Sequence, residues 1–236
     1  MKQEDIKEQK TISEKIDAFF TKNRKIALIA LACVGLIIAA VVISVIIVDS
    51  SNKKAIAQVE SIIYDFETFK SEKLTNALDS LTDEEKRLLS EEAQSVIEKL
   101  SPFQSKNNYA GFMANQQIGD IYFGNGDFEK ALEAYEKVSF SENTYIAGVV
   151  SFNAASCADE LSQFEKAYTY YTKASTCKNF PFKERALFNA ARVQESIDKT
   201  KALSVYDMLV RDYPDSEWGL LALNLYRFHH SESPKF

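Results

Sequence analysis

The 236-residue sequence is poor in glycine and proline, which interrupt helices, and in cysteine and histidine, which bind transition metals. It has only 7 glycines and 4 prolines, too few for the many tight turns of a β protein, so a mostly helical chain is expected. Its three cysteines, Cys33, Cys157 and Cys177, form no CxxC motif, and its two histidines, His229 and His230, are neighbours near the C-terminus. We therefore expect no metal site, no disulfide and no redox centre.

The motifs of the common enzyme classes are also missing. The sequence has no P-loop, no GxSxG, no HExxH and no dinucleotide-binding glycine pattern. The acidic groups 83–85 and 91–92 are typical of a helix N-terminus and of a solvated helix face. We expect no catalytic residues, no bound cofactor and no enzymatic activity.

The net charge of −6 is unevenly distributed. Residues 1–25 carry seven basic and five acidic side chains, so the rest of the chain has a net charge of −8. An acidic body argues against nucleic-acid binding, which needs a basic surface. The charge would suit a basic or unfolded protein partner, but acidic residues that only maintain solubility explain it equally well.

One long run of residues, Ile26–Val48, carries no charge over 23 positions. At 1.5 Å per residue, this helix would be roughly 34 Å long, enough to cross a hydrocarbon core of about 30 Å. The run is longer than the apolar core of a cleavable signal peptide. Residues 30–33 (ALAC) loosely resemble a lipobox, but cleavage there would leave an apolar N-terminus. We predict an uncleaved transmembrane helix over residues 26–48.

The flanking charges predict how this helix is oriented. Within fifteen residues, two basic residues follow it and four precede it: Lys53 and Lys54, against Lys15, Lys22, Arg24 and Lys25. The positive-inside rule then places residues 1–25 in the cytoplasm and the remainder outside. In a bacterium this predicts a single-pass inner-membrane protein with a periplasmic body.

Residues 49–108 are predicted to form a helical stalk and a divergent half-repeat. Apolar residues recur at helical spacing over 53–73, as in a helical stalk that either continues the membrane helix or follows it as a separate helix. Thr82 and Glu85 have the spacing of a capping box that begins the next helix, and Pro102 ends it. The apolar face of this second helix is expected to pack against the first repeat.

The most informative feature is a segment that occurs three times, at Gly119–Val138, Ala155–Ala174 and Ala190–Leu209, with steps of 36 and 35 residues. Each copy places small residues and a tyrosine on facing sides of two helices, which allows a close approach. One such pair cannot bury its own apolar face, so stacked copies are needed. The packing residues are Gly119, Tyr122, Ala131 and Tyr135, then Ala155, Ala167 and Tyr171, then Ala190, Ala202 and Tyr206.

Turn signals separate the helices of these copies. Residues 124–127 (GNGD) break and cap the chain inside the first copy. Ser162 and Glu165 predict a second capping box inside the second copy. After the third copy, residues 216–228 read as a last amphipathic helix in which Trp218 is expected to pack.

This pattern resembles the tetratricopeptide repeat (TPR) family, whose period is about 34 residues. The resemblance covers residues 112–214, with smaller residues than the family has at Asn115, Ser151 and Ala186. It implies an all-α chain: a single N-terminal transmembrane helix, a right-handed α-solenoid of about three helix pairs over 109–214, and a capping helix and tail over 215–236.

In that family, the first helix of each pair lines a groove that binds peptides. Carried over to this sequence, the groove residues are Met113, Gln116, Asp120 and Phe123, then Val149, Phe152, Ser156 and Asp159, then Glu184, Leu187, Ala191 and Gln194. This set is apolar and acidic and lacks the basic residues of a carboxylate clamp, so an apolar or basic extended segment is the expected ligand. Phe123 and Phe152 could instead pack between repeats.

The layout of a short tail, one anchor and exported repeats is similar to the YfgM-type bacterial inner-membrane proteins. Residues 19–23 (FFTKN) and 105–132 carry this resemblance. It implies translocon subunits, periplasmic chaperones or unfolded exported chains as partners, and no nucleic acid. Two alternatives remain open: a structural scaffold subunit of a secretion or motility complex, and a cytosol-facing receptor on an organelle membrane with the reversed topology.

Overall fold

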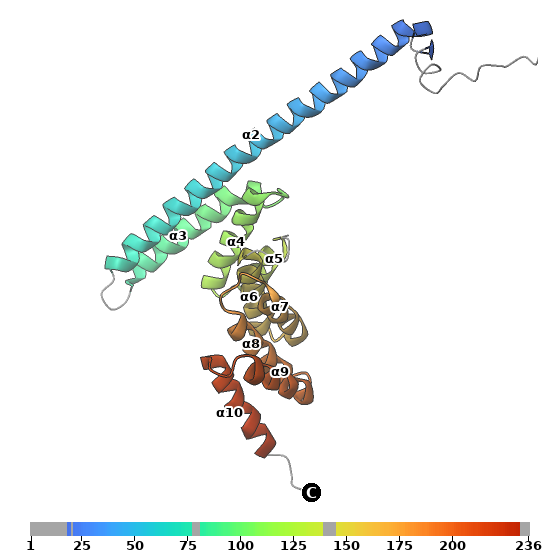
Figure 1. Ribbon diagram of the computed structural model, residues 1–236. Coiled ribbons are helices and arrows are strands. Elements are labelled where there is room, and N and C mark those ends of the chain that lie inside the picture. Colours follow the sequence, from blue (N-terminus) through green and yellow to red (C-terminus); the bar gives the residue numbers. More distant parts are fainter. Residues whose placement is uncertain (1–17, 20, 77–80, 139–144, 232–236) are drawn as a thin grey trace, which may run out of the picture. The chain divides into compact units, whose positions relative to one another are not determined.

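The computed structural model describes residues 18–19, 21–76, 81–138 and 145–231. All regular structure in these residues is helical, which confirms the predicted all-α class. The chain divides into two compact units, residues 1–53 and 54–236. The elements are α2 (Arg24–Asn76), α3 (Asp83–Leu100), the 3₁₀ helix η1 (Ser101–Phe103), α4 (Tyr109–Gly124), α5 (Phe128–Glu136), α6 (Tyr145–Glu160), α7 (Phe164–Thr176), α8 (Lys183–Glu195), α9 (Lys199–Asp212) and α10 (Glu217–Ser231) (Figure 1).

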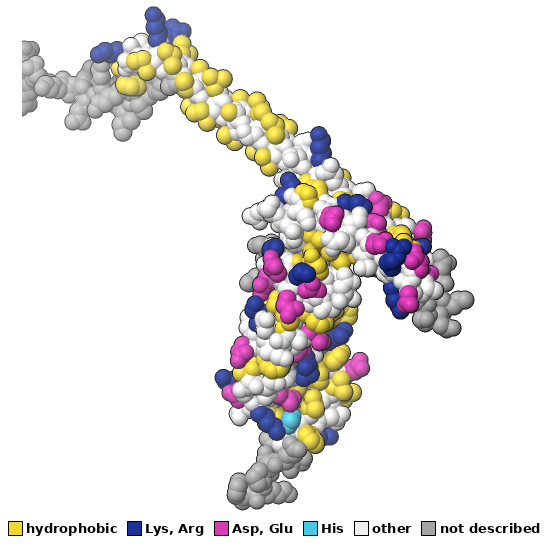
Figure 2. Space-filling view, turned by 180° about the vertical axis from the view of Figure 1, so that it is seen from behind, with side chains coloured by type: hydrophobic (Ala, Val, Ile, Leu, Met, Phe, Trp, Pro, Cys, Tyr) yellow, Lys and Arg dark blue, Asp and Glu magenta, His cyan; other side chains and the backbone are white. Residues whose placement is uncertain are grey.

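The first unit contains the N-terminal part of α2. Its large apolar side chains are all exposed, from 51% at Val34 to 71% at Leu36. Figure 2 shows them as a continuous apolar surface with Lys and Arg side chains gathered at its start. Among the described residues, α2 alone is long and apolar enough to cross a membrane, with a mean hydropathy of 3.2 in its most apolar part. Such a helix is a candidate membrane anchor or signal sequence.

The second unit begins with a helix hairpin formed by residues 54–76 of α2 and by α3 (Figure 1). Val59 and Phe66 of α2 are buried in one cluster with Val96 and Leu100 of α3 and with Ile118 of α4. The apolar residues whose helical spacing predicted a stalk therefore form the face of α2 that packs against α3 and α4. This part of α2 and α3 together cover the first helix of the first repeat.

The end of this hairpin is fixed by the predicted caps. Thr82 accepts a hydrogen bond from the backbone N–H of Glu85 at 3.2 Å, and the Glu85 carboxylate accepts one from the backbone N–H of Thr82 at 2.9 Å. The capping box is therefore confirmed. Helix α3 ends at Leu100, and Pro102 lies in the 3₁₀ turn that follows.

Three consecutive helix pairs follow: α4 with α5, α6 with α7, and α8 with α9. Each helix contacts the next along the chain, and α10 contacts both α8 and α9 (Figure 1). The repeat pattern predicted small residues where the two helices of a pair approach each other, and these residues are buried. Ala131, Ala155, Ala167 and Ala190 are 0% exposed and Ala202 is 1% exposed.

The turns inside the first two pairs have the same backbone form. Gly126 has φ 76° and Ser162, 36 residues later, has φ 56°. In both turns the backbone N–H of the next residue donates a hydrogen bond to the carbonyl five residues before it. The distances are 2.9 Å from Asp127 to Tyr122 and 2.8 Å from Gln163 to Ala158. The predicted capping box of Ser162 is wrong, because Ser162 takes the left-handed turn position and Gln163 becomes the N-cap, without a side-chain cap bond.

Candidate functional site

The buried tyrosine of each helix pair reaches a polar side chain on the first helix of that pair. Tyr135 donates to Asp120 at 2.6 Å, and the hydroxyls of Tyr171 and Ser156 lie 3.2 Å apart. The third copy has Ala191 in the place of Asp120 and Ser156, and its Tyr206 donates to Glu195 at 2.6 Å instead. Polar side chains on this face of the first helices are therefore tied into the repeats.

Room for the first of these tyrosines depends on a glycine. A Cβ atom at Gly119 would lie 2.6 Å from the ring of Tyr135, closer than any van der Waals contact allows. In the second and third copies an alanine occupies this position, at Ala155 and Ala190. The same tyrosine carries the hydroxyl that donates to Asp120 at 2.6 Å.

A series of polar contacts joins the first helices of the three pairs to one another and, at the two ends, to α2 and α10; we call it the polar ladder. Its members come from α2, α4, α6, α8 and α10, so it runs along the side on which a groove was predicted. Its rungs are Glu67 with Gln117 (3.3 Å), Asp120 with Asn153 (3.2 Å), Asp159 with Arg192 (an ion pair) and Glu195 with His229 (3.3 Å).

The electrostatics of Asp120 follow from its position in the ladder. Burial raises the pKa of its carboxyl above the usual 3.8, against the opposing effect of the hydrogen bonds from Tyr135 and Asn153. Burial and the neighbouring Asp120 raise the pKa of the Tyr135 hydroxyl far above its usual value. The Tyr135 hydroxyl therefore stays protonated and acts as a hydrogen-bond donor, and the Asp120 carboxyl acts as the acceptor in a structural contact.

The predicted groove residues lie in three environments. Phe123 is 38% exposed, and its ring meets Phe128 edge-on with centroids 5.5 Å apart. Gln194 is 4% exposed and Ala191 is 0% exposed, so the carry-over from the family was wrong to place these two on an open surface. Ala191 is instead in the core cluster that α10 covers. The others are half-buried: Met113, Gln116, Asp120, Val149, Phe152, Ser156, Asp159, Glu184 and Leu187.

Phe152 belongs to a cluster that we call the aromatic patch, made of Phe152, Phe180, Phe182, Arg185 and Trp218. The Phe152 ring lies 5.9 Å from that of Phe180, which in turn meets Phe182 edge-on at 5.7 Å. The Arg185 guanidinium lies 5.2 Å from the Phe152 centroid and 5.8 Å from the Trp218 centroid. Phe182 is 54% exposed, so the patch reaches the surface.

The patch depends on another close approach. A Cβ atom at Gly148 of α6 would lie 2.5 Å from the Cβ of Phe180, so a glycine is needed there. Phe180 is 4% exposed and leaves the neighbouring Phe182 at the surface. The loop between α7 and α8 is thereby held against α6.

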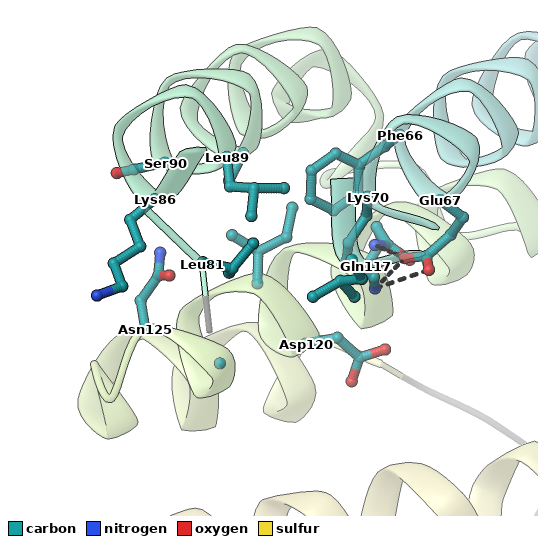
Figure 3. Close-up of a pocket in the computed structure, with 14 residues that line it drawn as sticks. Phe66, Glu67, Lys70, Leu81, Lys86, Leu89, Ser90, Gln117, Asp120 and Asn125 are labelled. Carbon is teal, nitrogen blue, oxygen red and sulfur yellow. Dashed lines mark hydrogen bonds and ion pairs between the residues drawn. The ribbon is translucent and has the colours of Figure 1, made fainter. Parts of the chain in front are cut away.

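A cleft of about 510 Å³ lies between α2, α3 and α4 (Figure 3). Its apolar wall consists of Phe66, Leu74, Leu81, Leu89, Ala93 and Ile121, and its polar rim includes Lys70, Lys86, Ser90, Gln117, Asp120 and Asn125. Lys70 pairs with Glu67 at 2.7 Å and lies 5.6 Å from the centre of the Phe66 ring. This cleft was not predicted, because residues 53–73 were interpreted as a stalk.

Several other residues of these sites were missed at the sequence level, namely Glu67, Asn153, Arg185, Glu195 and His229. The sequence does contain a signal for part of the ladder. Asp120 and Asn153 are separated by 33 residues, as are Asp159 and Arg192. Complementary polar residues spaced by slightly less than one repeat indicate contacts between neighbouring first helices.

No cluster of metal-binding side chains occurs within the part of the chain that the structure describes. Its three cysteines are free thiols, with Cys157 and Cys177 buried. Burial raises the pKa of Cys157 to about 12, so its reactive thiolate form is rare at neutral pH. The described thiols of the repeats are therefore core residues.

Comparison with known proteins agrees with this geometry. Two segments match the tetratricopeptide repeat family, residues 114–139 and residues 185–216, which lie in the first and third helix pairs. The first and third helix pairs are thus similar to tetratricopeptide repeats. A TPR repeat-containing protein of Treponema pallidum (strain Nichols) is 34% identical over 118 residues, which is 49% of this chain and 49% of that protein. The matched segment thus spans about half the length of each.

The TPR assignment bears on function at a general level. TPR repeats are scaffolds for protein–protein interaction and are typically not enzymes, so the TPR helix pairs of this chain imply protein partners.

Proposed function

We propose that this protein is a membrane-anchored TPR interaction module of the bacterial cell envelope. In this proposal α2 anchors the chain in the inner membrane, with residues 1–25 in the cytoplasm and the repeats in the periplasm. Its partners are translocating or newly exported chains, together with translocon subunits or periplasmic chaperones. The uncharged run of α2 and the excess of positive charge before it support this arrangement.

The observation that carries the proposal is the contrast between polar and aromatic groups on the first-helix side. Asp120 and Asp159 are engaged in the polar ladder, so they are poorly available to a partner. Aromatic groups at Phe123 and Phe182 remain 38% and 54% exposed. Exposed aromatic residues next to arginine are typical of the anchor points of protein interfaces.

The orientation is tested with a reporter that is active only in the periplasm, fused after Phe236 of the full chain. We expect activity from this fusion and none from the same reporter placed after Lys25. A silent fusion at Phe236 with a stable, membrane-bound product would contradict the proposed orientation and favour the cytosol-facing receptor.

A second function, as a scaffold subunit of a fixed envelope complex, is favoured by the cleft between α2, α3 and α4. Its volume of about 510 Å³ and apolar wall would accept a few side chains of one constant partner. A photo-crosslinking residue at Leu89 tests this. One adduct of fixed size would support the scaffold, and a spread of adducts like that from the aromatic patch would support the interaction module.

A further inference from the structure

Helix α10 has apolar residues on two opposite sides. On one side, Ala222 is 0% exposed and lies in the cluster that joins α10 to α8 and α9 (Figure 1). On the other side the large apolar residues are exposed, Leu220 by 53%, Leu221 by 40% and Phe228 by 55%. A helix that is apolar on both sides is expected to lie between two neighbours. The described part of the chain covers only the first of these sides.

The exposed side of α10 follows the seven-residue pattern of a coiled coil. In such a pattern the residues that face the partner helix recur at alternating steps of three and four. An asparagine at one of these positions fixes the register of the helix pair. The exposed residues at these steps are Glu217, Leu220, Asn224 and Arg227, with Leu221 and Phe228 beside them. We call this set of six residues the outer seam.

The outer seam carries opposite charges at its two ends. Glu217 begins it, and Arg227 lies roughly 15 Å farther along the helix; both side chains are exposed. When two copies of the seam pack antiparallel, the glutamate of each copy meets the arginine of the other. A parallel pair brings like charges together at both ends, which is unfavourable at an interface. The charges therefore favour an antiparallel pair of identical helices.

The spacing of the seam fits the same arrangement. Glu217 faces Arg227 of the other copy when the antiparallel pair is centred at position 222 along the helix. In that register Leu220 faces Asn224 of the other copy, and the Leu221 side chains of the two copies lie beside each other near the centre. One register thus satisfies both the charged and the apolar positions. We propose that two copies of this chain associate through the outer seam, with their α10 helices antiparallel.

This interface is self-complementary, as the two-fold interface of a homodimer must be. A single pair of helices of 15 residues is expected to bury less surface than a standard stable interface of about 1,600 Å². We therefore expect a dissociation constant on the order of micromolar. Anchoring of both copies in one membrane would raise their effective concentration. The inference goes beyond the proposed function, because it does not depend on which partner the repeats bind.

The first test is the mass of the full chain in detergent, measured by light scattering over a dilution series. We expect a monomer–dimer equilibrium for the wild type. Leu221→Ser should weaken association about tenfold, because each copy loses one apolar side chain from the interface. Met208→Ser on α9 is the matched control, since Met208 is 39% exposed and Leu221 is 40% exposed. This control should dimerise as the wild type does, and thermal melting establishes that both variants are folded.

A charge exchange tests the pairing of the two ends. Glu217→Arg alone and Arg227→Glu alone each place like charges against each other at both ends of the dimer, so each should weaken association several-fold. The double variant carries both changes and restores two opposite-charge pairs. We expect it to dimerise nearly as well as the wild type. A double variant that is weaker than either single variant would overturn the proposed register.

Disulfide crosslinking tests the direction of the helices. Cys33, which is exposed, is first replaced by serine, whereas Cys157 and Cys177 are buried and stay in place. Glu217→Cys and Arg227→Cys are then made in separate chains, one of them enlarged by an N-terminal tag. Oxidation of the mixture should link the two variants to each other, and oxidation of either one alone should give no dimer. Dimers from each variant alone would show a parallel pair and overturn the inference.

Two further results would also overturn it. A wild type that stays monomeric at every concentration would show that the outer seam binds something other than a second copy. A dimer that Leu221→Ser and the charge variants leave unchanged would place self-association on another surface, such as the membrane helix. Both results leave the proposed function to its own test, the crosslinks to exported chains.

Discussion

One carboxylate oxygen of Asp120 accepts a hydrogen bond from Tyr135 at 2.6 Å and another from Asn153 at 3.2 Å. Tyr135 belongs to the same helix pair as Asp120, whereas Asn153 belongs to the next pair. A single half-buried acid thereby links the two helices of one pair to the first helix of the next pair. The stability of the array at this point depends on three side chains from α4, α5 and α6.

Tyr135→Phe tests the first of these bonds. We expect a loss of about 1–2 kcal/mol in the free energy of unfolding, because the buried carboxylate loses a donor without a replacement. Tyr168→Phe on α7 is the control, because Tyr168 takes no part in the polar contacts described above and packs only at the side of the core cluster. This substitution should change stability little. Equal melting temperatures for Tyr135→Phe and wild type would show that the bond contributes nothing.

Asp120→Asn tests the pH dependence. The folded-state pKa of Asp120 is raised above its usual 3.8 by burial. The protonated form is therefore favoured by folding, so this contribution is full below the unfolded-state pKa and is lost as pH rises through the folded-state value. Asparagine accepts the same hydrogen bonds but does not titrate. Melting measured from about pH 3.5 to 7 should show wild type losing stability relative to Asp120→Asn as the pH rises, and parallel curves would contradict the shift.

Ala167→Leu tests the close contact inside the second helix pair. Ala167 is 0% exposed, so a larger side chain must displace its neighbours. We expect destabilisation by about 1–3 kcal/mol. Thr169→Leu, at an exposed position of the same helix, serves as the control and should be nearly neutral. An unchanged melting temperature for Ala167→Leu would show that the repeat register assigned to α7 is incorrect.

A double-mutant cycle on Asp159 and Arg192 tests the third rung of the ladder. The Asp159 side chain is 16% exposed and that of Arg192 is 46% exposed, so solvent screens the pair. We expect a coupling energy of about 0.5–1 kcal/mol that decreases with added salt. Urea unfolding of Asp159→Asn, Arg192→Gln and the double variant gives this value. Additive single effects would show that the rung does not couple the second and third repeats.

The helical class and the repeat register could be predicted because they depend on local spacing. Gly119, Ala155 and Ala190 recur at nearly constant intervals, and a small residue has the same effect at each. The turn at Ser162 was mispredicted, because a serine three residues before a glutamate satisfies the capping-box pattern. The backbone there instead repeats the left-handed turn of Gly126, with φ 56° at Ser162.

The candidate site was harder to predict than the fold. The family register correctly grouped Phe152 with the first helices, but it could not show that Phe180 and Arg185 pack on its ring. Those contacts depend on the loop between α7 and α8, whose path no periodicity specifies. An acidic groove was predicted from the residue types alone. In the structure Asp120 and Asp159 are paired within the polar ladder, so they are less available to bind a ligand.

The most direct test of the central claim, that the first-helix side binds polypeptides, is in-cell photo-crosslinking from position 182 in the intact membrane protein. Phe182 is 54% exposed, so its replacement should leave the core intact. The matched control is Asp207, an exposed residue of α9, the second helix of its pair. We predict many adducts of different sizes with exported chains from position 182 and few from position 207. Adducts from position 207 with none from position 182 would contradict the account and place the binding surface on the second helices.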